Sequence, residues 1–464
     1  MPMLPPFDPW CSAAVAADVA ADTHANAHAL AARRDRRLGT LLTSAARGPT
    51  LYRRLLKRRD PASTCLQDLP IMRKAELMHR FGDWVSDPDL QLDALRRFVA
   101  EPAHIAEPFL GRYMVWESSG SGGEPGVFVQ DASAMAVYDA LEALRRPLLR
   151  PLQRLFDPWS LAEQTVFVGA IGGHFASTVS IERLRRLNPT LARRLHSVNF
   201  LQSTPQLVAE INALAPAVLA TYPSVAVLLA QEHRDGRLRV APQEVWTGGE
   251  TLSMAMRTFV RQTFGCALAD SYGASEFLSM ACECRCGGLH LNSDWVVLES
   301  VDDRGHPMPP DEAGATTLLT NLANHVQPLI RYDLGDRVTL RAKACECGSS
   351  LPLIEVQGRS GDTLWLGRPD AKAVSVLPLA LSTVLEEEAG LYDFQLVQQG
   401  PCALLLRTGL HGDAARSTLR RARTALVAFL ARQGAPGVQV HCRSGEPGQC
   451  CRSGKVQRVV ASLS

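Results

Sequence analysis

The sequence predicts an α/β protein with a largely parallel sheet, followed by a smaller α+β domain. Short apolar runs that suit buried strands alternate with longer segments whose apolar residues recur at helical spacing. This alternation is typical of parallel sheets that are covered by helices. The chain has 464 residues, which is more than one hydrophobic core usually supports, so we expect at least two domains.

The elements of the N-terminal region follow from the spacing of its apolar residues. Helical spacing covers residues 12–32 and 133–155. Three short apolar runs, at 165–171, 217–222 and 243–247, are predicted as buried strands. The alternating region extends to about residue 357.

A segment rich in glycine and polar residues, 357–362, is the candidate hinge because it separates two patterned regions. Beyond it the pattern predicts helices at 377–388 and 413–433, and strands at 394–397, 403–406 and 438–441. We therefore expect an N-terminal domain over 1–357, a hinge over 358–362 and a C-terminal domain over 363–464.

Composition and charge exclude several classes of protein. Apolar residues form 46% of the chain and charged residues 21%, as in ordinary globular proteins. The 49 Lys and Arg residues face 47 Asp and Glu residues, so the net charge of +2 gives no argument for nucleic acid. No uninterrupted apolar stretch reaches the roughly 20 residues that span a bilayer. We expect a cytoplasmic protein with no membrane span and no nucleic-acid partner.

A glycine-rich loop, Ser118-Ser-Gly-Ser-Gly-Gly-Glu-Pro-Gly126, lies between the apolar stretch 113–116 and the run 127–129. Its glycines allow backbone N–H groups and serine hydroxyls to converge on an anion such as a triphosphate. A flexible hairpin loop would have the same composition. It is not a Walker loop, since the G-x-x-x-x-G-K-[ST] pattern is absent from this segment.

Four further motifs carry polar or charged residues. Thr247-Gly-Gly-Glu250 and Asp270-Ser-Tyr-Gly-Ala-Ser-Glu276 each follow a strand-like run, where ligands collect in α/β proteins. Ile330-Arg-Tyr-Asp-Leu-Gly-Asp336 adds a carboxylate that could accept hydrogen bonds from ribose, and Ser453-Gly-Lys-Val-Gln-Arg458 adds a lysine. Each motif taken alone is also compatible with a simple turn.

The order and spacing of these motifs, from about residue 65 to 460, resembles the adenylate-forming (AMP-binding) superfamily, and within it the phenylacetate-CoA ligase branch. The resemblance implies a large N-terminal adenylate-forming domain with mostly parallel sheets and a small mobile C-terminal α+β domain. It also implies ATP and Mg²⁺ as cofactors. The lysine often found late in the family's glycine loop is Glu124 here, and the stretch after Arg359 also departs from the pattern.

The resemblance assigns roles to the motif residues. As catalytic residues it implies Lys455, which would bridge the acyl carboxylate and the α-phosphate, Glu276, which would hold Mg²⁺, and Arg359 at the domain junction. As nucleotide-binding residues it implies Ser118, Ser119, Gly120, Ser121, Gly122, Gly123, Gly248, Gly249, Glu250, Ser271, Tyr272, Gly273 and Asp336.

The acid-binding residues are expected in three segments: Gly172, Gly173, His174 and Phe175, then Tyr222, then Ala274 and Ser275. Small residues would leave space for a flat ring, against which Phe175 and Tyr222 could pack. A lone histidine is more often structural than functional, and this alternative stands for His174.

A cysteine cluster is the second strong signal. Cys284, His290, Cys345 and Cys347 could close a tetrahedral zinc site, and Cys282 or Cys286 could replace Cys284. Some members of the branch have a similar structural zinc site. Buried reduced cysteines are the alternative. A nucleic-acid zinc module is disfavoured because no basic recognition helix follows either half of the cluster.

These features predict an AMP-forming ligase that activates an aromatic acid as an acyl adenylate and transfers it to the phosphopantetheine thiol of coenzyme A or an acyl carrier protein. The segments Gly172–Ala176 and Leu289–Glu299 most resemble arylpolyene and xanthomonadin-type ligases, which suggests a hydroxybenzoate. A synthetase with a non-thiol acceptor and a non-catalytic zinc-stabilised binding protein are the alternatives. The sequence leaves open whether the protein forms a homodimer.

Overall fold

A computed structural model describes residues 4–57, 59–61, 63–118, 125–151, 163–359, 364–367, 374–376, 378–445 and 457–461. The chain divides into two compact units. The first contains residues 1–199 and 269–356, and the second contains residues 200–268 and 357–464. The predicted α/β class is confirmed, since strands joined by helices pair in parallel in each unit.

The first unit begins with helices, continues through a hairpin and a parallel strand pair, and ends in antiparallel strands. Its helices are α1 (Pro9–Thr23), α2 (Ala27–Arg47), α3 (Thr50–Leu55), α4 (Lys74–His79), α5 (Phe81–Trp84), α6 (Leu92–Ala100), α7 (Ala132–Leu144), α9 (Ala176–Leu187) and α10 (Pro189–Ala192), with 3-10 turns Leu66–Asp68 and Pro102–His104. Its strands are β1 (Met114–Glu117), β2 (Val127–Gln130), β3 (Thr165–Gly169), β4 (Leu195–Asn199), β8 (Phe277–Glu283), β9 (Leu289–Leu291), β10 (Val296–Val301), β11 (Thr316–Asn321), β12 (Tyr332–Asp333) and β13 (Asp336–Leu340), together with most of β7 (Ala267–Ala274) and β14 (Leu353–Arg359).

Strand pairing in the first unit is of two kinds. Strands β3 and β4 are parallel, with Thr165 opposite Leu195. Strands β7, β8, β9 and β14 pair antiparallel in that order, and β10, β11 and β12 form a separate antiparallel sheet. One core joins the N-terminal helices, the β1–β2 hairpin, α7 and the strands β8 to β12, with Trp84, Trp116 and Tyr138 among its largest fully buried side chains.

The helical spacing over 12–32 corresponds to two helices, because the chain turns between Thr23 and Ala27. The side chain of Asn26 accepts a hydrogen bond from the backbone N–H of Ala29 and begins α2 as an N-cap. The part of the spacing over 133–155 that the structure describes gives α7, which ends at Leu144, and residues 152–155 lie outside the described residues. Pro147 follows closely, and proline cannot donate the hydrogen bond that would continue the helix.

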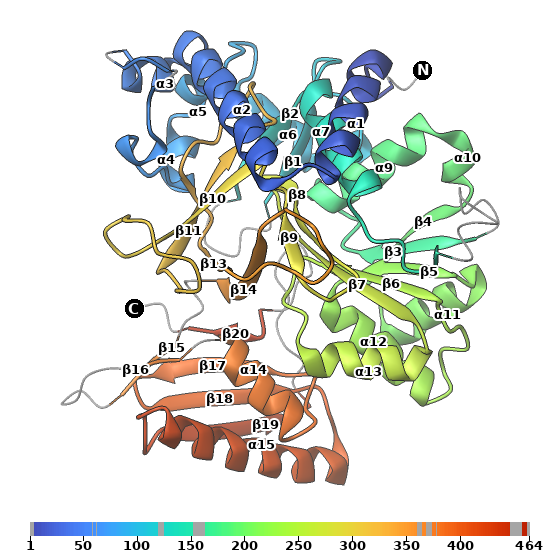
Figure 1. The fold of residues 1–464 in the computed structure, drawn as a ribbon. Coiled ribbons are helices and arrows are strands. Elements are labelled where there is room, and N and C mark those ends of the chain that lie inside the picture. The colour runs from blue at the N-terminus through green and yellow to red at the C-terminus, as the bar shows by residue number, and fades with distance from the viewer. Residues whose placement is uncertain are drawn as a thin grey trace. The chain divides into compact units, whose positions relative to one another are not determined.

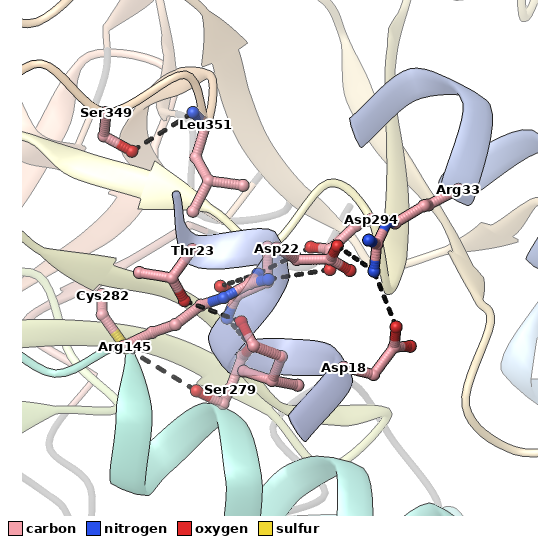
Figure 2. Close-up of polar contacts among 12 residues, drawn as sticks. Asp18, Asp22, Thr23, Arg33, Arg145, Ser279, Cys282, Asp294, Ser349 and Leu351 are labelled. Carbon is pink, nitrogen blue, oxygen red and sulfur yellow. Dashed lines mark hydrogen bonds and ion pairs between the residues drawn. The ribbon is translucent and has the colours of Figure 1, made fainter. Parts of the chain in front are cut away.

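A buried charge network ties α1 and α2 to the rest of the first unit. Arg145, at the C-cap of α7, donates to the two carboxylate oxygens of Asp294 over 2.6 and 2.8 Å. Arg37 donates to Asp294 over 3.0 Å and to Asp22 over 3.1 Å. Figure 2 shows Asp22 and Asp294 close together, with Arg33 contacting Asp18. Three carboxylates and three guanidinium groups therefore balance in charge.

The second unit contains a parallel strand pair with helices and the C-terminal α+β module. Its first part consists of α11 (Thr204–Leu214), β5 (Val218–Thr221), α12 (Pro223–Arg234), β6 (Glu244–Gly248) and α13 (Met254–Phe264). The module consists of β15 (Leu364–Leu366), β16 (Val374–Val376), α14 (Pro378–Glu387), β17 (Gln395–Gly400), β18 (Ala403–Thr408), α15 (Gly412–Arg432), β19 (Gln439–Ser444) and β20 (Val459–Val460).

The C-terminal module has a sheet with strand order β19-β18-β17-β20 (Figure 1). Strands β17 and β18 form an antiparallel hairpin, and β19 and β20 add to it in parallel. The module has a hydrophobic core of its own, drawn from residues 364–459 and including Leu385, Phe394 and Leu426. The helices and strands predicted beyond residue 363 are confirmed, with ends that differ by a few residues. Among the described residues, no helix is long and apolar enough to cross a bilayer.

Candidate functional site

The glycine-rich loop joins the two strands of the β1–β2 hairpin, in which Glu117 lies opposite Val127. Ser118 forms two hydrogen bonds with Gly126 at the base of the loop. Its backbone N–H donates to the carbonyl of Gly126 over 2.8 Å, and its hydroxyl accepts from the N–H of Gly126 over 2.8 Å. Residues 119–124, which include Ser119, Gly120, Ser121, Gly122 and Gly123, lie outside the described residues. The hairpin therefore fixes both ends of the predicted phosphate loop.

The motif Asp270–Glu276 forms the end of β7 and its turn into β8. The pairing between the two strands shifts register between Tyr272 and Ala274. Gly273 sits at this irregularity, and a Cβ atom there would lie 1.8 Å from the carbonyl oxygen of Leu278. Only glycine fits such a close backbone approach. Tyr272, next to this glycine, and Glu276, three residues after it, both have half-buried side chains.

Three hydrogen bonds fix Glu276 and its neighbour Ser275. Its carboxylate accepts a hydrogen bond from the hydroxyl of Tyr332 over 2.9 Å. Its carbonyl accepts from the side-chain amide of Asn321 over 2.9 Å. The indole of Trp116 donates to the adjacent carbonyl of Ser275 over 2.8 Å. The Glu276 carboxylate is thus fixed while the side chain stays partly exposed, as a ligand for an exchangeable cation requires.

A second tyrosine–carboxylate pair joins β7 to β13. The hydroxyl of Tyr272 donates to the Asp336 carboxylate over 2.7 Å, although the two residues are 64 positions apart. Asp336 begins β13, after the tight turn at Gly335, whose φ is +68°. One carboxylate oxygen of Asp336 is therefore engaged by Tyr272.

The segment from Gly172 to Phe175 leads into α9 and lies beside the end of β1. The backbone N–H of Glu117 donates to the carbonyl of His174 over 2.7 Å. The His174 imidazole is buried and lies 5.6 Å from the ring of Phe98. Burial lowers the pKa of His174 and favours the neutral ring. Gly172 has open space around its Cα, whereas a side chain at Gly173 would meet the Phe175 ring.

In the second unit, the motif Thr247–Glu250 forms the end of β6 and the turn after it. Gly249 has a φ of +78°, which makes glycine favourable at this turn. The Glu250 carboxylate accepts from the backbone N–H of Ser224 over 3.1 Å, at the start of α12, where a negative charge is favoured. Tyr222 is buried directly before α12, and its ring lies 5.8 Å from that of Phe200. The segments 222–224 and 248–250 are therefore joined.

Of the two remaining predicted catalytic residues, the structure describes one. Arg359 is the exposed last residue of β14. Lys455 lies outside the described residues, three positions before Arg458. Their predicted roles stay predictions.

The four predicted metal ligands come together. The ligand atoms of Cys284, His290, Cys345 and Cys347 all lie within 4.8 Å of one another. The Sγ atoms of Cys284 and Cys345 are 3.6 Å apart, and the Sγ of Cys347 is 3.3 Å from Nε2 of His290. Ligands of a tetrahedral zinc ion would be separated by about 3.8 Å for two sulfurs and about 3.6 Å for sulfur and nitrogen. The donor set therefore fits zinc.

Hydrogen bonds around the cluster orient its ligands. The other ring nitrogen of His290, Nδ1, lies 2.7 Å from the carbonyl oxygen of Leu351, which leaves Nε2 for the metal. Cys286 is exposed and donates its backbone N–H to the Cys284 sulfur over 3.4 Å. Cys282 is buried in β8, and its thiol lies 3.7 Å from the hydroxyl of Ser279 (Figure 2). The structure thus brings Cys284, and neither of its two alternatives, into the four-residue group.

Sequence reasoning did not identify Trp116, Asn321 or Tyr332 as residues that support the site. Tyr332 lies inside the motif Ile330–Asp336, and its membership of this motif is the feature of the sequence that could have identified it. Trp116 and Asn321 lie on strands far from Glu276 in sequence, and only the fold brings them together.

No protein-family model and no characterised protein sequence matches the chain. Solved structures, in contrast, match the chain. The chain is similar to 2-hydroxyisobutyryl-CoA ligase in the postadenylation state with 2-HIB-AMP, at 18% identity and a TM-score of 0.67, over 95% of this chain and 91% of that one. The thioesterification state of the same ligase with 2-HIB-AMP and CoA gives 19% identity, a TM-score of 0.55 and the same coverage.

A benzoate CoA ligase from Burkholderia xenovorans LB400 is similar at 15% identity and a TM-score of 0.50, over 74% of this chain and 67% of that one. At such low identity the likeness establishes the fold. The chain therefore has the fold of the adenylate-forming CoA ligases.

Proposed function

We propose that the protein is an acid–thiol ligase that uses ATP to convert a carboxylic acid to an acyl adenylate and then transfers the acyl group to a thiol. The observation that carries the proposal is the pair of tyrosine-held carboxylates, Glu276 with Tyr332 and Asp336 with Tyr272, on either side of the Gly273 bulge. Their positions match the motifs that suggested adenylation, and the fold likeness supports the same chemistry.

The proposed nucleotide site uses the predicted motif residues. The Ser118–Gly123 segment would donate N–H and hydroxyl groups to the phosphates. The Gly248–Glu250 turn would lie beside adenine, Ser271 and Tyr272 would line the site, and Asp336 would accept from the ribose hydroxyls. Because Tyr272 already donates to Asp336, its ring would fix the carboxylate that reads the ribose.

The proposed chemistry is limited by charge. An acyl carboxylate that attacks the α-phosphate meets a polyanion, so the site must supply positive charge where negative charge develops. Mg²⁺, when bound, would screen the phosphates, and Glu276 is the residue that would hold it. Lys455 would contact both the carboxylate and the α-phosphate. Arg359 would act at the junction between two domains, residues 1–357 and residues 363–464. These domains would move relative to each other about the hinge 358–362.

We propose a structural zinc ion at Cys284, His290, Cys345 and Cys347. Four protein ligands would leave no position for water, which is typical of structural rather than catalytic zinc. The ion would join the β8–β9 turn to the segment before β14.

We propose that the acid is aromatic and of hydroxybenzoate type. The motifs expected to bind the acid contain the aromatic residues Phe175 and Tyr222 and the small residue Gly172, a composition that is compatible with this class. The acceptor would be the phosphopantetheine thiol of coenzyme A or of an acyl carrier protein, in the cytoplasm. Product analysis separates this outcome from transfer to a non-thiol acceptor.

The decisive test is acid-dependent ATP–pyrophosphate exchange over benzoates, hydroxybenzoates, phenylacetates and cinnamates, followed by product analysis with coenzyme A. Lys455→Ala should lower the exchange roughly 100- to 1,000-fold, because one positioned charge is lost from the transition state. The control is Lys57→Ala, an exposed lysine after α3, which should leave exchange unchanged. A wild-type protein that binds an acid without exchange would instead support a non-catalytic binding protein.

A further inference from the structure

Arg331, the residue before Tyr332, has a backbone conformation that residues with a side chain rarely adopt. Its φ is +50°, in the left-handed region, and it lies in a bend directly before strand β12. Among the described residues, four other non-glycine residues have a positive φ, and these are Ala106, Leu110, Ala215 and Asp311. All four lie in turns or at a helix C-cap. Outside a turn, such a conformation persists only where the surrounding contacts hold it.

Contacts of this kind surround the Arg331 guanidinium. The side chain is 5% exposed and forms an ion pair with the Glu299 carboxylate of β10, over 3.3 Å from Nε. Nη1 donates to the carbonyl of Leu69 over 2.7 Å, and Nη2 donates to the carbonyl of Gly305 over 3.3 Å. Hydrogen bonds from a charged donor are stronger than those between neutral groups. The far end of the side chain is therefore fixed by three separate segments of the first unit.

Backbone hydrogen bonds hold the peptide groups on both sides of Tyr332. The carbonyl of Arg331 accepts from the N–H of Met72 over 2.9 Å. The N–H of Asp333 donates to the carbonyl of Met72 over 2.9 Å, so that Met72 pairs with Tyr332 as in a parallel ladder. The N–H of Arg331 itself donates to the buried hydroxyl of Thr320 over 3.1 Å. The left-handed residue is thus held through its backbone as well as its side chain.

The Tyr332 side chain is the group that these contacts place. Tyr332 lies between Met72 on one side and Leu319 of β11 on the other. Its hydroxyl, at the far end of the ring, donates to the Glu276 carboxylate over 2.9 Å. A hydrogen bond weakens steeply with distance and angle, so a change of φ at Arg331 that turned the next residue would remove this one.

We infer that Arg331 and Glu299 are positioning residues for the proposed magnesium ligand Glu276. Their ion pair, with the carbonyl contacts of the guanidinium, holds residue 331 in the left-handed conformation. This conformation directs the Tyr332 hydroxyl at the Glu276 carboxylate. The inference rests on the proposed adenylation, in which Glu276 holds Mg²⁺. Both residues act through Tyr332, and neither contacts the substrate.

Two substitutions at residue 331 separate the backbone from the side chain. Arg331→Ala removes the guanidinium and keeps a Cβ atom, so the backbone should leave the left-handed region. Arg331→Gly removes the same guanidinium, but glycine adopts a positive φ without steric cost. The magnesium concentration for half-maximal acid-dependent pyrophosphate exchange should rise about tenfold in Arg331→Ala and less than about threefold in Arg331→Gly. An equal rise in both variants, or no rise in Arg331→Ala, would overturn the inference.

A double-mutant cycle tests whether Arg331 acts through Tyr332. In a Tyr332→Phe background, Arg331→Ala should change the magnesium requirement less than about twofold, because the hydroxyl that it positions is already gone. A tenfold effect that persists in this background would contradict the inference. Glu299→Gln keeps the arginine and serves as the second variant if Arg331→Ala does not fold. It should raise the magnesium requirement about three- to tenfold, again only while Tyr332 is present.

The matched control is Arg183→Ala on α9. The Arg183 side chain is 1% exposed and donates to the two carboxylate oxygens of Asp139 over 2.8 and 3.0 Å. This variant also loses a buried guanidinium from the first unit, so it should lower Tm, but it should leave the magnesium requirement unchanged. A rise like that of Arg331→Ala would show that general structural damage is sufficient, and the inference would fail.

Hydrogen exchange gives a readout that needs no activity, since the Met72 and Asp333 amides form the hydrogen bonds on both sides of Tyr332. Arg331→Ala and Glu299→Gln should speed exchange at these two amides, while Arg331→Gly and the β10–β11 amides stay close to wild type. Unchanged hydrogen exchange in Arg331→Ala would overturn the inference even if the wild-type protein formed no adenylate. Absence of acid-dependent pyrophosphate exchange in the wild type would instead contradict the proposed function.

Discussion

Asp22 gives the most quantitative expectation for stability. Its side chain is fully buried between Arg33 and Arg37 and next to Asp294. Burial, together with the neighbouring Asp294 carboxylate, raises the pKa of Asp22 from 3.8 to about 6. Burial is the largest single influence on Asp294 and opposes its ionisation, but the hydrogen bonds and charge of Arg145, the charge of Arg37 and the hydrogen bond with Asp22 together lower the pKa of that group. The folded protein therefore takes up a proton at Asp22 under mildly acidic conditions.

The direction in which stability changes with pH follows from the linkage between protonation and folding. Because the folded pKa lies above the unfolded value, protonation of Asp22 favours the folded state at low pH, and this contribution is lost as pH rises through about 6. At pH 5.0 the folded carboxyl would be about 90% protonated, whereas the unfolded one would stay mostly ionised. Between pH 7.5 and 5.0 the Asp22 contribution to the free energy of unfolding should rise by about 1.4 kcal/mol.

Urea unfolding followed by tryptophan fluorescence at pH 5.0, 6.0 and 7.5 measures this contribution by comparing wild type with Asp22→Asn. The difference between the two free energies should change by about 1.4 kcal/mol across the range, because other titrating groups cancel in the comparison. Asp18→Asn is the control, since this carboxylate contacts the same two arginines but is 43% exposed. A parallel pH profile for Asp22→Asn and wild type would refute the reasoning.

Three further expectations concern the site. Cys347→Ser should remove most of the bound zinc and lower Tm by roughly 4–8 °C, measured by metal analysis and calorimetry, whereas Cys286→Ser should retain the metal. Gly273→Ala should lower the free energy of unfolding in urea by at least about 2 kcal/mol, because its Cβ would overlap the Leu278 carbonyl. The control is Gly39→Ala in α2, where a Cβ has open space, and it should be neutral or stabilising in the same assay. Tyr332→Phe should raise the magnesium concentration for half-maximal pyrophosphate exchange about tenfold, since the Glu276 carboxylate loses a fixing hydrogen bond; an unchanged magnesium dependence would contradict the role of Glu276.

Much of the fold is local in origin and could be predicted from sequence. Helix α15 is predicted by apolar residues that recur on one face, and β18 by the short apolar run that precedes this helix in the sequence. The cysteine cluster was also predictable, because ligand type and spacing restrict the choices and favour Cys284, although ruling out the alternative Cys282 required the strand β8 that buries it.

Contacts between distant segments could not be predicted in this way. Asp22 and Asp294 meet because α1, α2 and the end of α7 converge on the loop before β10, and no local pattern marks either aspartate. The contact between Tyr272 and Asp336 similarly joins residues that are 64 positions apart in the sequence. Motif order suggested that these residues serve one site, but it gave no information about which side chain holds which carboxylate.

The central claim is that the protein forms an acyl adenylate, and direct detection of this product tests it best. Wild-type protein incubated with ATP, Mg²⁺ and hydroxybenzoates should produce acid-dependent pyrophosphate and an acyl-AMP that mass spectrometry detects before any thiol is added. Lys455→Ala should form it at least about 100-fold more slowly. If no acid across the benzoate, phenylacetate and cinnamate panel gives acyl-AMP, or if Lys455→Ala forms it at the wild-type rate, the account is contradicted.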